Sequence, residues 1–88
     1  MKVRAEISLY PLRVTDLSRP IDEFSRTLEA KGLEVQMGPM SSSVAGESKE
    51  LFNALQEAFE RLAEKYQVVM VSKISNACPQ ISPDGKTQ

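Results

Sequence analysis

The spacing of the apolar residues changes repeatedly along this chain, and the order of these changes limits the possible folds. Alternating or mainly apolar segments of strand length lie at 3–10, 33–37, 40–45 and 68–75. Between them, apolar residues recur every three or four positions over 18–31 and 48–66, which is typical of helices that pack one face on a sheet. The predicted order of elements is therefore β-α-β-β-α-β.

Local signals indicate where these segments begin and end. Pro11 has no N–H to give to a sheet ladder, so we expect it to close the first strand. Ser18 is the expected N-cap of the first helix, and Gly32 can adopt the left-handed conformation that ends it. The pair Gly38-Pro39 predicts a sharp turn between the second and third strands.

This order of elements predicts one small domain of the α+β class. Right-handed crossovers place the first and third strands in the middle of an antiparallel sheet and the second and fourth at its edges. Both helices then cover one face, which gives a ferredoxin-like βαββαβ sandwich over residues 1–78. Residues 79–88 lose the periodic pattern and are expected to form a flexible C-terminal tail. The last strand is apolar at both parities in its first half, so we expect it to be covered on both faces there.

The expected core lies between the helices and the sheet. Its large members should pack against one another, because helix and strand patterns place them on facing surfaces. They are Ile7, Leu9, Phe24, Leu28, Leu55 and Phe59, and Phe52 belongs to the same predicted apolar stripe of the second helix.

Composition excludes several functions. The chain of 88 residues has 11 Lys and Arg against 12 Asp and Glu, so it lacks the basic excess that nucleic-acid binding needs. It contains no histidine, the commonest general base and a frequent metal ligand, and we predict neither an enzyme nor a metal or cofactor site. The single cysteine, Cys78, permits no internal disulfide, and no apolar run is long enough to span a membrane. These features favour a cytoplasmic protein.

The sheet face without helices holds the most informative residues. Alternation in the first strand points one set of side chains away from the helices, and the other strands add hydroxyls and a lysine. The set includes Arg4, Glu6, Ser8, Tyr10, Ser41, Ser43, Lys73 and Ser75. Two interpretations remain open, a floor for a small ligand and a polar interface between copies of the chain.

Three short motifs resemble the YkoF-like, thiamine-binding family of small ferredoxin-like proteins. The segment 6–12, Glu-Ile-Ser-Leu-Tyr-Pro-Leu, is similar to the first strand of that family. The segment 38–47, Gly-Pro-Met-Ser-Ser-Ser-Val-Ala-Gly-Glu, resembles its second signature, and 73–75, Lys-Ile-Ser, resembles the end of its fourth strand. The resemblance covers roughly residues 3–79.

The resemblance implies a function. It implies dimers or tetramers that bind thiamine or its hydroxymethylpyrimidine moiety without catalysis. Carried over by motif, the expected ligand-binding residues are Glu6, Ser8, Tyr10, Ser41 and Ser43. The alternative is a structural or regulatory oligomerisation module without a small-molecule ligand, and a small enzyme is the third and weakest interpretation.

Overall fold

The structure is a computed structural model that describes residues 1–77; Cys78 and the predicted tail at 79–88 lie outside the described residues. Its elements are β1 (Lys2–Leu12), α1 (Ser18–Ala30), β2 (Glu34–Met37), β3 (Ser42–Glu47), α2 (Ser48–Ala63) and β4 (Gln67–Ser75). This is the predicted order of elements.

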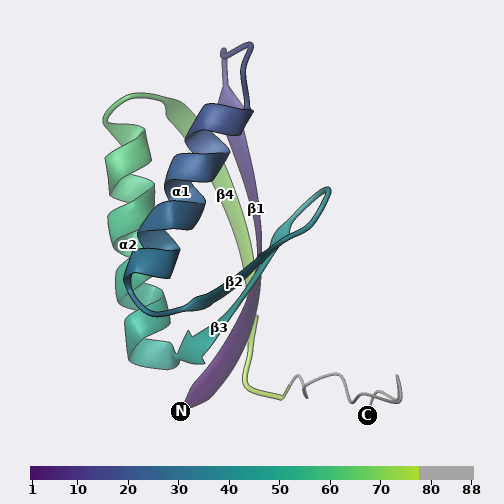
Figure 1. Cartoon of the computed structure of the whole chain (residues 1–88), viewed down its shortest axis with the longest axis vertical. Coiled ribbons are helices and arrows are strands. Elements are labelled where there is room, and N and C mark those ends of the chain that lie inside the picture. Colours follow the sequence, from purple (N-terminus) through teal and green to yellow (C-terminus); the bar gives the residue numbers. More distant parts are fainter. Residues whose placement is uncertain (78–88) are drawn as a thin grey trace.

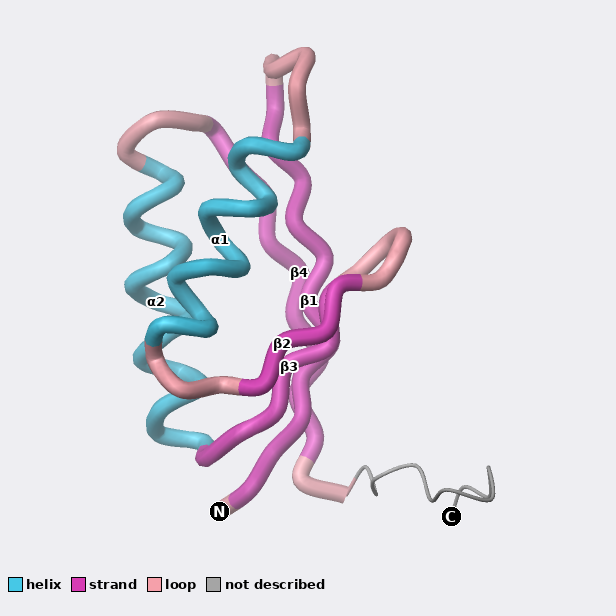
Figure 2. Tube along the Cα trace, in the orientation of Figure 1, coloured by secondary structure: helices cyan, strands magenta, loops and turns pink. Residues whose placement is uncertain are grey.

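The four strands form one antiparallel sheet in the order β2-β3-β1-β4. Both helices lie on the same side of this sheet, as Figures 1 and 2 show. The ferredoxin-like α+β fold is thereby confirmed, with β1 and β3 in the middle, as right-handed crossovers require.

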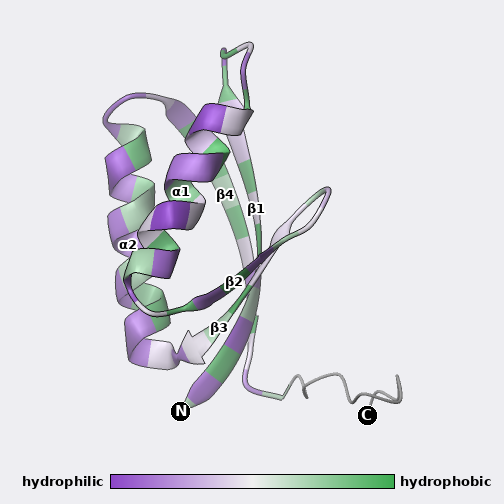
Figure 3. Cartoon of the chain, in the orientation of Figure 1, coloured by the Kyte–Doolittle hydropathy of each residue, from purple (hydrophilic) through white to green (hydrophobic). Residues whose placement is uncertain are grey.

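A single apolar core fills the space between the helices and the sheet. Odd-numbered residues of β1, such as Ala5 and Ile7, point into it together with Val44 of β3. From the helices, Leu28 and Leu62 are fully buried against them. Figure 3 shows the same division, since hydrophobic and hydrophilic residues alternate along β1.

Two aromatic residues of α2 do not belong to this core, contrary to the prediction. Phe52 is 56% exposed, and Phe59 is half-buried outside the core cluster. At 100° per residue, both lie on the flank of α2 opposite Glu57, which pairs with Lys31 at the end of α1 at 2.8 Å. That flank faces away from α1, so no second helix covers it.

The predicted N-cap of α1 is also corrected. The N-cap is Leu17, which makes no side-chain cap bond, and Ser18 is the first helical residue. Oδ1 of Asp16, just before the N-cap, accepts hydrogen bonds from the backbone N–H of Ser18 at 3.0 Å and from its hydroxyl at 2.6 Å. These bonds lower the pKa of Asp16 below its ordinary value. At the other end Gly32 has a φ of 84°, so the predicted left-handed glycine is confirmed.

Several element ends differ from the prediction. β1 continues through Pro11 to Leu12, because β3 reaches only to the partner of Ile7 and β1 pairs with β4 alone beyond that point. β3 begins at Ser42 rather than at residue 40, because the preceding residues form a turn closed by the N–H of Gly38 and the carbonyl of Ser41 at 2.9 Å. α1 ends one residue early and α2 three residues early.

Coverage of β4 on both faces is not found in the single chain. Val69 and Val71 point away from the helices and are 46% and 48% exposed. The apolar residues of the other parity, Val68 and Met70, pack on the core. The second apolar set of β4 therefore lies on an uncovered surface.

Candidate functional site

The uncovered sheet surface, called here the open face, carries the even-numbered residues of β1. Its strands are aligned so that side chains form rows across the sheet, because directly paired residues point to the same side. One row crosses all four strands and consists of Gln36, Ser43, Glu6 and Lys73. Glu6 thus lies in the middle of the sheet, on the face away from the core, so its carboxylate has no role in core packing.

Hydrogen bonds tie two further residues, Ser41 and Arg4, to this row. The hydroxyl of Ser41 donates to Oε2 of Glu6 at 3.3 Å, and Nη1 of Arg4 donates to the hydroxyl of Ser43 at 3.1 Å. The ion pairs formed within residues 1–77 lie elsewhere, so Glu6 and Lys73 are paired in the ladder but not through their charged groups.

A cavity of about 360 Å³ lies over the same part of the open face, and we call it the β1–β4 cavity. Its volume is within the range common for small-molecule sites, roughly 300–1,000 Å³. It is partly open and combines backbone and aliphatic surface with cations, hydroxyls and one carboxylate. The lining residues are Arg4, Ala5, Glu6, Ser43, Lys73, Ile74 and Ser75.

The structure brings three of the five predicted site residues together. Glu6 and Ser43 line the β1–β4 cavity, and Ser41 reaches Glu6 from the turn before β3. Ser8 and Tyr10 share the open face but lie one and two rows further along β1, opposite Val71 and Val69.

Tyr10 belongs instead to an apolar group on the open face. Its side chain is 51% exposed, and Leu12 beyond it is exposed as well. With Val69 and Val71 of β4 they form what we call the apolar patch, at the end of the sheet away from the β1–β4 cavity. Such a cluster is unusual on a surface in contact with water.

Three residues of the cavity lie on the predicted open face but are not among the predicted site residues. Arg4, Lys73 and Ser75 become its neighbours through the pairing of β1 with β4, in which Arg4 is opposite Ser75 and Lys73 opposite Glu6. Their alternating positions along each strand predict that they lie on the open face, but only the register of β1 against β4 determines which of them are neighbours.

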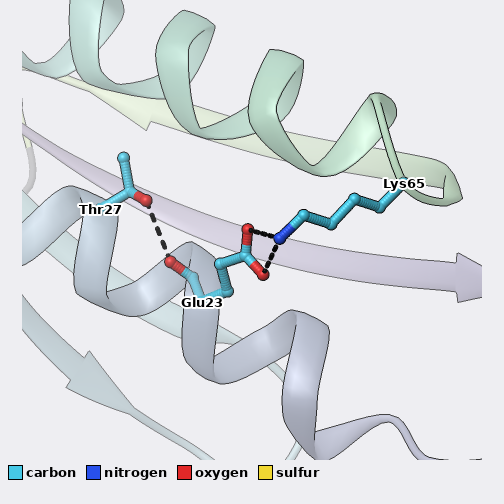
Figure 4. A network of polar contacts seen from close by, with 3 residues as sticks. All are labelled: Glu23, Thr27 and Lys65. Atoms are coloured by element: carbon cyan, nitrogen blue, oxygen red, sulfur yellow. Dashed lines mark hydrogen bonds and ion pairs between the residues drawn. The ribbon is translucent and has the colours of Figure 1, made fainter.

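A second hollow, of about 560 Å³, lies on the helical side. Figure 4 shows its main contact, in which Nζ of Lys65 lies 3.1 and 3.2 Å from the two carboxylate oxygens of Glu23. The Thr27 hydroxyl donates to the backbone carbonyl of Glu23 at 3.0 Å, and Asp22 pairs with Arg26 at 2.9 Å. Because its carboxylates are already paired, this hollow is better explained by contacts between and within the helices.

Two further observations concern residues 1–77. No group of three or more histidine, cysteine, aspartate and glutamate side chains is arranged there to hold a metal ion. In the same part of the chain, neither helix has the length and apolar character that crossing a membrane requires.

Solved structures share this fold. A hypothetical protein from Methanocaldococcus jannascii is 25% identical, with a TM-score of 0.80 over 90% of this chain and 84% of its own. A protein from Streptococcus pneumoniae is 28% identical, with a TM-score of 0.76 over 96% and 94%. A protein from Thermotoga maritima, described as a candidate thiamine biosynthesis/salvage protein, is 24% identical, with a TM-score of 0.76 over 99% and 90%.

Sequence comparison identifies the family. No curated protein matches the chain. A family model described as thiamine-binding protein matches residues 5–86, which include every helix and strand of the domain apart from the first three residues of β1. The chain therefore belongs to the family of thiamine-binding proteins.

Proposed function

We propose that this protein is a cytoplasmic homo-oligomer that binds thiamine or its hydroxymethylpyrimidine moiety and does not catalyse a reaction. The observation that carries the proposal is Glu6, a carboxylate in the middle of the open face, beside a cavity of ligand size and without an ion-pair partner in the described chain. Family membership supplies the ligand class.

The chemistry of an aminopyrimidine suits these residues. Its exocyclic amine is a donor, which the Glu6 carboxylate can accept, and its ring nitrogens are acceptors, which hydroxyl groups can serve. Ser41 and Ser43 bring such hydroxyls next to Glu6 from the side of β3. In this proposal Glu6 orients the ring, the two serines complete its hydrogen bonds, and Ser8 and Tyr10 meet the part of the ligand that extends along β1.

Self-association is the second part of the proposal. The apolar patch of Tyr10, Leu12, Val69 and Val71 leaves side chains in water that a sheet face normally buries. A second copy is the proposed occupant, because a two-fold related copy presents the same apolar patch and can bury it against its equivalent. A stable contact of this kind buries at least about 1,000 Å² in total.

The alternative function is an oligomerisation module without a small ligand. The same apolar patch favours it, since a sheet interface alone would account for Val69 and Val71. In that case Glu6 and Lys73 would serve the interface.

Native mass spectrometry of freshly purified protein, combined with titration calorimetry, tests the proposal. We expect an oligomer, a co-purified or added ligand of the mass of thiamine or hydroxymethylpyrimidine, and saturable binding. An oligomer that binds neither compound at millimolar concentration would support the alternative module instead.

A further inference from the structure

Two cations, Arg4 and Lys73, line the β1–β4 cavity together with Glu6, and Nη1 of Arg4 is directed toward Ser43 on β3. Arg4 is opposite Ser75 and Lys73 is opposite Glu6, so Arg4 and Lys73 are diagonal neighbours across the ladder. Diagonal neighbours lie about 7–8 Å apart, within reach of long side chains. Both residues line the cavity.

These two positive charges are poorly compensated. Arg4 donates to the neutral hydroxyl of Ser43, and the ion pairs of residues 1–77 involve neither Arg4 nor Lys73. Glu6 is the single carboxylate among the lining residues, so the lining has one positive charge in excess even with Glu6 ionised. The next carboxylate on this face, Glu34, lies in the row of Arg4 but two strands away, beyond Ala45. Two adjacent like charges on one sheet face repel each other, which is a cost unless a bound anion offsets it.

The hydroxyls around the cations add donors of the kind that phosphate oxygens accept. Ser43 lies on one side of β1 and Ser75 on the other, both in the cavity lining. Arginine, lysine and hydroxyl donors around one point are a common arrangement for a phosphate group. A ligand that carries only positive charge would be repelled by the excess positive charge of the lining.

From this arrangement we infer that the preferred ligand is the phosphate monoester of the pyrimidine compound, with its phosphate between Arg4 and Lys73 and its amine at Glu6. This rests on the proposed function. Arg4 and Glu6 are two residues apart on one strand, about 7 Å along it. A compact ligand whose amine and phosphate-bearing hydroxymethyl group are attached to the same small ring can reach Glu6 and Arg4 together.

Titration calorimetry with four compounds tests the inference: hydroxymethylpyrimidine, its phosphate ester, thiamine and thiamine monophosphate. We expect the phosphate ester of hydroxymethylpyrimidine to bind at least about tenfold more tightly than its parent, the ratio that one charge-assisted contact can give. Thiamine monophosphate carries its phosphate on the second ring, further from the amine, and should gain less over thiamine. Comparison of the two esters shows whether the single pyrimidine ring or the whole of thiamine fits the cavity better when it bears the phosphate. Raising the ionic strength should reduce the ratio, because these cations are partly exposed to solvent.

Variants separate the role of the cations from that of the carboxylate. Arg4→Gln and Lys73→Gln should each bring the ratio of ester to parent affinity toward one, and the second variant serves if the first does not fold. Glu6→Gln should weaken parent and ester together and keep the ratio. Lys49→Gln, an exposed cation on α2, is the matched control and should leave the ratio unchanged.

The outcomes are distinguishable. Binding of hydroxymethylpyrimidine with equal or weaker binding of its phosphate ester overturns this inference and leaves the proposed function in place. An unchanged ratio in both Arg4→Gln and Lys73→Gln also overturns it. Failure of all four compounds to bind overturns the proposed function and the inference with it.

Discussion

Glu6 and Lys73 lie directly opposite each other on β1 and β4, yet the hydrogen bond that Glu6 accepts comes from Ser41 on the other side of β1. A carboxylate that has a cation in the neighbouring position but is not bound to it can accept a donor from elsewhere. The proposed ligand amine is such a donor.

Glu6→Gln tests this role. We expect ligand affinity to fall by about 1.5–3 kcal/mol, the usual value of a hydrogen bond to a charged group, while the fold and subunit number stay unchanged. Titration calorimetry and sedimentation on the same variant measure both. Glu29→Gln, an exposed acid on α1, is the control for the change in charge. If the variant loses its assembly, and ligand affinity falls only as far as the loss of assembly explains, Glu6 would be assigned to the interface.

A charge in the apolar patch should break the assembly. Val69→Lys places an ammonium group opposite Tyr10 on the proposed contact surface, where burying an unpaired charge is costly. We expect a folded monomer by light scattering and circular dichroism. Phe52→Lys is the matched control, because Phe52 is exposed to a similar degree but lies on the helical layer. Dissociation by Phe52→Lys and not by Val69→Lys would move the interface to the flank of α2.

The core should respond unequally to two truncations of α2. Leu62 is fully buried, and Leu62→Ala should lower the free energy of unfolding by about 2–5 kcal/mol. Phe59→Ala should cost less, despite the larger side chain removed, because Phe59 lies outside the core cluster. Urea denaturation gives both values, and a larger loss for Phe59→Ala would contradict the position of α2.

Gly32 permits a test of backbone conformation alone. Apart from Gly32 and its two chain neighbours, no residue has an atom within 4 Å of where a Cβ would be, so a side chain there meets no obstacle, but the φ of 84° is unfavourable for it. We expect Gly32→Ala to lower the free energy of unfolding by about 1 kcal/mol. Gly32→Asn should cost less, since asparagine adopts this conformation more readily. Equal losses in denaturant melts would point to a different cause.

The stabilisation that the Asp16 hydrogen bonds give to the start of α1 should depend on pH. Hydrogen bonds from Ser18 lower the pKa of Asp16 in the folded protein below the ordinary value of 3.8. The stabilisation is therefore fully present above pH 3.8 and is lost as the pH falls through the folded pKa. The difference in Tm between the wild type and Asp16→Ala should be constant at neutral pH and shrink below about pH 4. A difference independent of pH would mean that ionised Asp16 does not stabilise the helix.

Much of this fold could be predicted from the sequence, because strand alternation and helical spacing both report burial directly. The alternation of β1 predicts its two faces, and with the order of elements it predicts the sheet. The ends of elements were less accurate where tertiary contacts decide them. Pro11 continues β1 because β3 does not extend beside it, and Phe52 stays uncovered because its flank of α2 faces away from α1.

The candidate site was predicted in part for a related reason. Parity assigned Glu6, Ser41 and Ser43 to the open face, but pairing of β1 with β4 decides which residues share a cavity. Arg4 and Lys73 come together through that register, which depends on the packed core and not on local pattern.

Because the residues of β1 alternate between two faces, the places where related chains can gain or lose residues are restricted. Ala5 and Ile7 belong to the core, whereas Arg4 and Glu6 line the cavity, so one strand serves both through alternate residues. An insertion or deletion of one residue inside β1 would exchange the two sets and destroy core and cavity together. Length variation among relatives should therefore be confined to the connections, such as 13–17 and 64–66, where it shifts no side chain from one face to the other.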